Sequence, residues 1–181
     1  TLVGVVAADL SLYVDDYRAA ERTFSLITQV VGRAGRGEKT GRALIQTYTP
    51  ENDVITFAAA QNYDAFYEQE IGLRGCPPFR DLFVLTASGT TESAVLQTCM
   101  RLRRSLEEWL RQPPYEGYRS QLLGPAPAAI AKVNNRYRYR LTLSTRNDKR
   151  MRALVAHLLC CAQKDKENRG VSVYADVNPL D

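Results

Sequence analysis

Residues 136–143, RYRYRLTL, alternate strictly between two kinds of side chain, and this alternation restricts the fold more than any other stretch of the chain. Successive side chains of a β-strand point to opposite faces of a sheet. One face of this strand therefore carries three arginines, Arg136, Arg138 and Arg140. The opposite face carries Tyr137, Tyr139, Leu141 and Leu143. We expect the second set to pack against helices and the arginines to lie on an open face of the sheet.

The segments around this strand predict one α+β domain. Apolar patterns with the periods of strands and helices predict its elements. In chain order these are a strand at 81–88, a helix at 91–111, a short strand near 121–123, a strand at 136–145, a helix at 148–163 and a strand at 171–177. This β-α-β-β-α-β order is typical of a ferredoxin-like fold.

The first 73 residues predict part of an α/β lobe. Apolar patterns predict a strand at 2–8, a helix at 19–31, a strand at 43–48 and two short helices at 54–61 and 63–73. The strand at 2–8 is continuously apolar, which is typical of a strand that is buried on both faces. Because the chain begins directly on this strand, we expect it to be part of a longer protein.

A pair of prolines marks the expected boundary between two domains, 1–73 and 74–181. Pro77 and Pro78 stop a helix and bias the residue before them to an extended backbone. The charge changes sign at the same place, because residues 1–73 carry 6 Lys/Arg and 10 Asp/Glu, whereas residues 74–181 carry 18 and 10. The second domain is therefore expected to bind a polyanionic partner. An ordinary domain with a solvated basic surface would have the same composition.

Residues that could hold a structural metal are few. Four cysteines and one histidine, His157, are present, and no two cysteines have the spacing Cys-x-x-Cys. A structural zinc site takes four Cys or His ligands at such spacings. We therefore expect no metal site, and buried, reduced thiols. No apolar run is long enough to span a bilayer, so no membrane partner is expected.

Residues 29–36, QVVGRAGR, join the end of the predicted first helix to two arginines. We expect the helix to break at Gly32 into a glycine-rich turn that carries Arg33 and Arg36. Glycine lets a backbone approach a ligand closely, and paired guanidinium groups suit a phosphate. A plain helix C-terminus with two solvated arginines is the alternative explanation of the same residues.

The spacing Gln29-x-x-Gly32-Arg33-x-x-Arg36 resembles the last conserved motif of superfamily-2 helicases, in their second RecA-like lobe. The wider sequence resembles one family of them, the primosomal protein N′ (PriA) replication-restart helicases. Further similar motifs are AERTF at 20–24, IQT at 45–47, GCPPF at 75–79, LGPAPA at 123–128 and RYRY at 136–139. The resemblance covers nearly the whole chain. It implies a partial RecA-like helicase lobe followed by a ferredoxin-like C-terminal domain.

The resemblance also implies roles around ATP. Arg33 and Arg36 would be catalytic and would reach across a lobe interface to ATP bound mainly by the first lobe, with Gln29 and Gly32 beside it. Asp9, after the first strand, would face ATP and couple it to the nucleic acid; a cap of the strand-to-loop turn is the alternative. ATP and Mg²⁺ are expected in the full-length helicase. The 181 residues alone lack the first lobe, so we expect them to need no cofactor and to be inactive.

The partners implied by the resemblance are forked and single-stranded DNA, single-stranded-DNA-binding protein and primosome proteins. The whole protein would unwind DNA 3′ to 5′ and restart stalled forks in the bacterial cytoplasm, at the nucleoid. The residues expected to bind DNA are Arg136, Arg138, Arg140 and Lys132. Lys149, Arg150 and Arg152 would dock the acidic, Phe-ended tail of single-stranded-DNA-binding protein. Asp148, next to them, has the wrong sign of charge for that ligand.

Two other functions fit the same residues. The first is a nucleic-acid-binding or ribosome-associated module, fused to a degenerate RecA-like lobe that has no ATPase coupling. Intact Arg33 and Arg36 argue against it, because a pure binder has no use for them. The second is a domain that binds only proteins, in which the arginines of the open face serve solubility. Behaviour that does not depend on salt would favour this second alternative.

Overall fold

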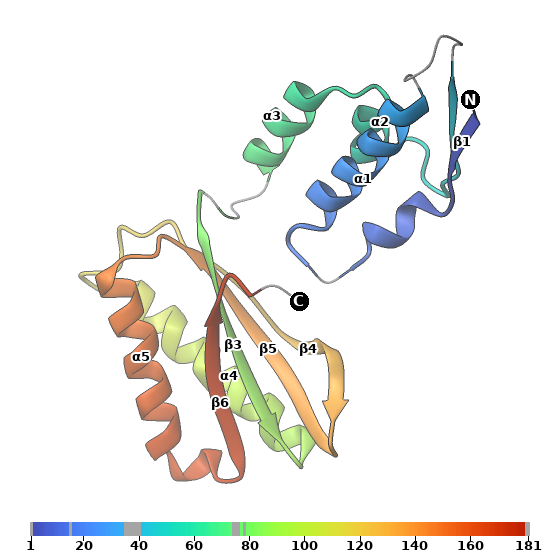
Figure 1. Ribbon diagram of the computed structural model, residues 1–181. Helices are drawn as coiled ribbons and strands as arrows, with labels where there is room; N and C mark the ends of the chain where they lie inside the picture. Colours follow the sequence, from blue (N-terminus) through green and yellow to red (C-terminus); the bar gives the residue numbers. More distant parts are fainter. Residues whose placement is uncertain (1, 15, 35–40, 74–76, 78, 180–181) are drawn as a thin grey trace. The chain divides into compact units, whose positions relative to one another are not determined.

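The chain folds into two compact units, the N-terminal unit (residues 1–74) and the C-terminal unit (residues 75–180). The structure is a computed structural model that describes residues 2–14, 16–34, 41–73, 77 and 79–179 (Figure 1). Both units combine helices with β-sheet, in agreement with the expected α/β class. Among the described residues, no helix has both the length and the hydrophobicity that crossing a membrane requires.

In the described part of the chain, the N-terminal unit consists of a two-stranded parallel sheet and three α-helices. Strand β1 (Leu2–Val5) pairs with β2 (Arg42–Ile45). The helical elements are η1 (Ala8–Ser11, a 3-10 turn), α1 (Ala19–Ala34), α2 (Asp53–Ala59) and α3 (Tyr63–Leu73). Phe24 of α1 stacks on Phe66 of α3 with ring centroids 4.2 Å apart. This pair lies in a core that also contains Ile27 and Ala58.

Strand β1 is not buried on both faces, and that expectation was therefore wrong. Val5 and Ile45 pack against the helical core. Leu2 of β1 and Leu44 of β2 are 68% and 62% exposed. Within the described structure the helical core lies against one face of this sheet, so the other face remains open. The continuous apolar run predicted a strand but not its surroundings.

The described residues of the C-terminal unit form a four-stranded sheet with two α-helices packed on one face (Figure 1). The strand order is β4-β5-β3-β6, and each neighbouring pair is antiparallel. The elements are β3 (Asp81–Gly89), α4 (Glu92–Leu110), β4 (Gln121–Val133), β5 (Arg136–Thr145), α5 (Lys149–Lys164), η2 (Lys166–Asn168) and β6 (Val171–Val177). Strands and α-helices thus follow the predicted order, and β5 and β6 have the predicted bounds.

The alternation along β5 determines which side of the sheet is packed. Its apolar side chains meet the helices: Leu141 and Leu143 are fully buried, and Tyr137 and Tyr139 pack against the same core. The helices contribute Val95, Cys99, Leu102 and Leu106 from α4 and Met151, Leu154, Val155 and Leu158 from α5. The prediction for this side is confirmed. We call the other side the open face. It carries Arg136, Arg138 and Arg140 of β5, Thr86 and Ser88 of β3, and Ser172, Tyr174 and Asp176 of β6.

Strand β4 is much longer than the short strand predicted near residues 121–123, and that prediction was wrong. It continues through Pro125 and Pro127 to Val133 as an edge strand, and β5 is its one partner among the described strands. Proline is tolerated at an edge because a strand there can lack an N–H without breaking the ladder. Gly124, with φ at 97°, allows the first shift in register: a Cβ there would lie 2.6 Å from the carbonyl oxygen of Arg140.

Helix α1 does not break at Gly32, as the sequence predicted, but continues through Arg33 to Ala34. A side chain that lies close to position 32 explains why this position is a glycine. The side-chain amide of Gln61 donates a hydrogen bond to the carbonyl of Thr28 at 3.3 Å, and a Cβ at position 32 would lie 3.2 Å from that amide nitrogen. Gly32 therefore lies inside the helix, where its small size lets the chain after α2 approach.

Candidate functional site

The last turns of α1 present Gln29 and Arg33 as exposed side chains. Residues four positions apart lie on one face of a helix, so these two side chains are neighbours. Gly32 contacts Gln61 of its own unit. Arg36 lies outside the described residues. The structure thus brings Gln29 and Arg33 together, and the roles of all these residues at ATP stay predictions.

Asp9 lies in η1 and is only 4% exposed. Its carboxylate accepts hydrogen bonds from the hydroxyls of Thr47 (2.5 Å) and Thr49 (2.6 Å) and from the backbone N–H of Tyr48 (2.8 Å). These donors, Thr47 first, hold the pKa of Asp9 far below its ordinary value. Both carboxylate oxygens therefore fasten η1 to the segment after β2, a structural role of the kind that the sequence left open. Contact between Asp9 and ATP stays a prediction.

The arginines of the open face lie across the sheet. Arg136 donates from Nε and Nη2 to the hydroxyl and carbonyl oxygens of Ser88, at 3.3 and 2.8 Å, and from Nη2 to the hydroxyl of Ser172 at 3.2 Å. Arg138 donates from Nη2 to the hydroxyl of Tyr174 at 3.2 Å. All three arginines of the face are partly buried. At least two guanidinium groups are therefore held at defined positions above the neighbouring strands.

Lys132 is separated from this row of arginines. It does not lie in a loop, as the sequence predicted, but in β4, opposite Tyr137. Residues that face each other in an antiparallel pair share one face of the sheet. Its Nζ lies 4.5 Å from the centroid of the Tyr137 ring and 3.3 Å from the hydroxyl. A bulge sets this register, because residues 128–131 of β4 stand opposite Arg138 alone.

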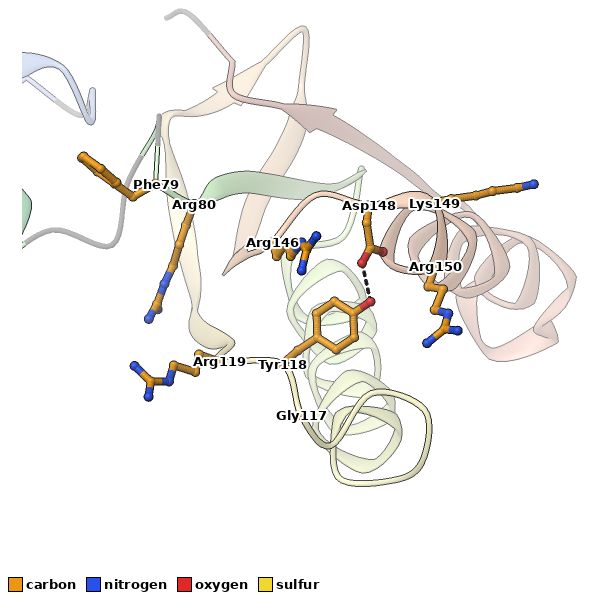
Figure 2. Close-up of a pocket in the computed structure, with 9 residues that line it drawn as sticks. All are labelled: Phe79, Arg80, Gly117, Tyr118, Arg119, Arg146, Asp148, Lys149 and Arg150. Carbon is orange, nitrogen blue, oxygen red and sulfur yellow. Dashed lines mark hydrogen bonds between the residues drawn. The ribbon is translucent and has the colours of Figure 1, made fainter.

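A pocket of about 700 Å³ lies where α5 begins (Figure 2). Five cationic side chains line it: Arg80, Arg119, Arg146, Lys149 and Arg150. The other lining residues are Phe79, Gly117, Tyr118 and Asp148. We call it the cationic pocket. Its residues come together because the starts of β3 and β4 both lie opposite the end of β5.

Asp148 is the one carboxylate among the residues that line the cationic pocket, and both of its oxygens are engaged. Tyr118 donates its hydroxyl to one oxygen at 2.5 Å, and the N–H of Met151 donates to the other at 2.9 Å, so Asp148 is the N-cap of α5. The bond from Tyr118 is the main cause that lowers the pKa of Asp148 and raises that of Tyr118. The capping carboxylate offsets the cations in the first turn of α5, which are unfavourable at a helix N-terminus.

The three residues expected to bind a partner do not all meet at this pocket. Lys149 and Arg150 line it, and Figure 2 shows the side chain of Lys149 extending away from the Tyr118–Asp148 pair. Arg152 is not among the lining residues and donates to the side-chain oxygen of Asn147 at 3.0 Å.

Sequence reasoning missed three cations of the pocket, Arg80, Arg119 and Arg146. They belong to separate segments, so no local spacing connects them. The signal that could have found them is topological. Each lies close to the start or the end of a strand, and the strand pairing brings the starts of β3 and β4 beside the end of β5, at the same end of the sheet.

Metal-binding side chains do not gather in the described part of the chain. No three His, Cys, Asp or Glu side chains are grouped there as ligands. The expectation of buried thiols holds for Cys99, where burial raises the pKa to about 11, but Cys160 and Cys161 are exposed. Cys161 Sγ lies 3.5 Å from Nε2 of His157, one turn earlier on α5.

The fold and these surfaces define a class of protein: a two-unit α/β protein whose C-terminal unit carries a row of arginines and a cationic pocket. Comparison with known families then gives the family. The family model described as primosomal protein N C-terminal domain matches residues 73–180, and the chain belongs to this family. The resemblance to the PriA family that the sequence motifs indicated is thereby confirmed.

Similar proteins named Replication restart protein PriA match the chain in both units. The protein of Bacillus subtilis (strain 168) is 35% identical over 99% of this chain and 22% of its own length. That of Synechocystis sp. is 44% identical over 78% of this chain and 17% of its own length. That of Chlamydia trachomatis serovar D is 33% identical over 99% of this chain and 23% of its own length. The chain thus spans about a fifth of the length of these relatives.

Proposed function

We propose that this chain is the C-terminal part of an ATP-dependent 3′-to-5′ DNA helicase that restarts stalled replication forks at the bacterial nucleoid. The observation that carries the proposal is the family match over residues 73–180. Relatives named Replication restart protein PriA extend the similarity through the N-terminal unit. In this proposal the N-terminal unit is the end of a second RecA-like lobe, and the C-terminal unit is a ferredoxin-like domain.

The N-terminal unit would supply half of an ATP site. Arg33 is exposed at the end of α1 beside Gln29, which suits it to meet a nucleotide bound by another lobe, and Arg36 would join it. An arginine placed against the γ-phosphate stabilises the charge of the transition state. Asp9 would act indirectly, because its hydrogen bonds hold η1 against residues 47–49. ATP and Mg²⁺ belong to the full-length protein, and the 181 residues alone would not hydrolyse ATP.

The C-terminal unit would bind DNA on the open face. Alternate residues of a strand are about 6.8 Å apart, so Arg136, Arg138 and Arg140 present cations at a spacing close to the phosphate repeat of an extended strand. Arginine suits phosphate because its planar fork carries several N–H donors. The bonds to Ser88 and Tyr174 already restrict two of these side chains. Less side-chain entropy is therefore lost when an anion binds.

The cationic pocket would take the acidic, Phe-ended tail of single-stranded-DNA-binding protein, and other primosome proteins would be further partners. Arg80, Arg119, Lys149 and Arg150 offer charges for an acidic peptide, and Phe79 and Tyr118 offer aromatic rings beside them. The negative charge of Asp148 does not argue strongly against an acidic ligand, because Tyr118 and the backbone of α5 already donate hydrogen bonds to its carboxylate. Arg152 would lie outside this contact.

Fluorescence anisotropy at two salt concentrations tests the binding of DNA. Labelled single-stranded and forked DNA are titrated with the 181-residue chain and with a triple variant, Arg136→Ala, Arg138→Ala and Arg140→Ala. We expect the wild type to bind with a steep dependence on salt. The triple variant should bind much more weakly, and its slope of log affinity against log salt should be smaller by about 2, at about 0.7 for each phosphate contact on a single strand.

The matched control removes three exposed cations from outside the open face: Arg104→Ala, Lys164→Ala and Arg169→Ala. It changes the net charge by the same amount and should keep most of the binding. If the wild type binds neither DNA at low salt, the proposal for the open face fails, and the arginines there serve solubility. Titration with the acidic tail peptide would then test whether the unit docks proteins only.

A further inference from the structure

The open face carries one aromatic side chain among its described residues, Tyr174 of β6. It is 39% exposed and lies opposite Thr86 of β3, which in turn lies opposite Arg140 of β5. Arg138 reaches across β3 and donates a hydrogen bond to the Tyr174 hydroxyl at 3.2 Å. The ring and this guanidinium group therefore form one patch, which we call the stacking ledge (Tyr174 and Arg138).

The burial of Thr86 indicates how these side chains lie. Thr86 points to the open face, away from the helices, and yet it is only 2% exposed. Its neighbours across the sheet are Arg140 and Tyr174. Side chains of the open face therefore cover Thr86. Tyr174 itself is 39% exposed, so part of this tyrosine is accessible from solvent beside Arg138.

A flat aromatic surface next to arginines suits an unpaired base. A base in a single strand exposes its π face and stacks on aromatic rings or guanidinium planes. The bases of a duplex stack on each other, so a flat sheet surface meets only their edges and the phosphates. Arg136 and Arg140 lie on either side of Arg138 along β5, where phosphates of the same strand would pass. Asp176, two residues beyond Tyr174 on β6, places a negative charge on the other side of the ring.

We propose that Tyr174, with Arg138, stacks an unpaired base and that the C-terminal unit therefore binds single-stranded nucleic acid in preference to duplex. The inference rests on the proposed binding of nucleic acid to the open face. The strand follows β5, with its phosphates at Arg136 and Arg140 and one base on Tyr174. It stays on the side of the ring away from Asp176, because that carboxylate repels phosphates.

Two substitutions of one residue test the ledge in the 181-residue chain. Tyr174→Leu removes the ring and keeps an apolar side chain, whereas Tyr174→Phe keeps the ring and removes only the hydroxyl. Anisotropy is measured with a labelled oligothymidylate and with a blunt duplex of the same length. We expect Tyr174→Leu to weaken binding of the oligothymidylate about 10-fold and to leave duplex binding nearly unchanged. Tyr174→Phe should remain close to the wild type on both DNAs.

The control is Tyr48→Leu, which replaces a tyrosine that is 88% exposed in the N-terminal unit and should change neither affinity. Circular dichroism verifies that each variant is folded. The ledge is refuted if Tyr174→Leu binds both DNAs like the wild type, or if it loses the same factor on both. It is also refuted if Tyr174→Phe loses as much as Tyr174→Leu, because stacking needs only the ring.

The triple arginine variant distinguishes the two possible failures. If it abolishes binding while Tyr174→Leu does not weaken the single strand, the open face binds DNA and the ledge is wrong. If the wild type binds no nucleic acid, both proposals are wrong. An oligouridylate and an oligodeoxyuridylate of the same length differ only in the sugar and therefore identify it: a ring-dependent affinity supports the ledge for either strand, and the strand that binds more tightly is the ligand.

Discussion

The two units cover their sheets to different extents. In the C-terminal unit, α4 and α5 pack on one face of four strands, and Leu85, Leu141 and Leu143 are fully buried there. In the described part of the N-terminal unit, the sheet has two strands. Val6, directly after β1, is 77% exposed, and Tyr48, three residues after β2, is 88% exposed. Stability grows with the apolar area removed from water, so we expect most of the folding free energy to belong to the C-terminal unit. The residues expected to face ATP would then lie in the less stable unit.

The largest expected effect of this difference is on hydrogen exchange. The slowest backbone amides of β3 and β5 should exchange about 100-fold more slowly than the slowest amides of β1 and β2, because the smaller sheet opens with less apolar surface to expose. Native-state exchange followed by mass spectrometry measures both units in one sample. Equal protection of the two sheets would contradict the comparison.

Substitution of one glycine in each unit compares the stability of the two units at single positions. The expected effects are intermediate in size. Gly124→Ala should destabilise the C-terminal unit by about 1–3 kcal/mol, because φ is 97° there and the new Cβ would lie 2.6 Å from a backbone oxygen of Arg140. Gly32→Ala should change the N-terminal unit by less than about 1 kcal/mol, since the Cβ meets only the movable end of Gln61 at 3.2 Å and alanine favours the helix.

Urea unfolding, followed by hydrogen exchange in each unit, measures both changes. A greater loss of stability for Gly32→Ala than for Gly124→Ala would reverse the expected order. It would mean that the end of α1 is packed more tightly than the contacts around Gly32 indicate.

The smallest expected effect depends on pH and is confined to the N-terminal unit. The pKa of Asp9 is lowered in the folded state, so its contribution to stability is present above its ordinary pKa of about 3.9 and is lost as the pH falls through the lowered folded value. Asp9→Asn should lower the melting temperature of this unit by a few degrees at pH 7. The difference from the wild type should shrink below about pH 4.

Thermal unfolding at a series of pH values checks this expectation. Asp64→Asn, which removes an exposed carboxylate of α3, is the matched control and should show no such convergence with the wild type. A constant difference between Asp9→Asn and the wild type at every pH would show that the charge of Asp9 does not stabilise the unit.

Local alternation predicted the parts of the fold that depend on one segment at a time. The observed bounds of α3, β5 and β6 equal the predicted ones. The packed side of β5 was also predictable, because the side-chain period of a strand assigns each residue to a face without knowledge of its neighbours. The same alternation placed the three arginines together on the open face.

Features that depend on which segments become neighbours were not predictable from local patterns. Only a short strand near residues 121–123 was expected, but β4 continues through Pro125 and Pro127 because it lies at an edge, where a missing N–H costs little. The face of Lys132 depends on a bulge. Gly32 was interpreted as a helix end because its neighbour Gln61 is distant in the sequence. The cationic pocket combines separate segments, so no single motif contains it.

The hydrogen bonds of Asp9 also affect the conformational entropy of the chain. They join Asp9 to Thr47 and Thr49, which are 38 and 40 positions away, so the carboxylate closes a loop that contains all of α1 and β2. A closed loop has fewer conformations open to it than a free segment of the same length. Asp9 therefore acts as a non-covalent cross-link. Its loss would remove one of the contacts that close this segment, beside the pairing of β1 with β2.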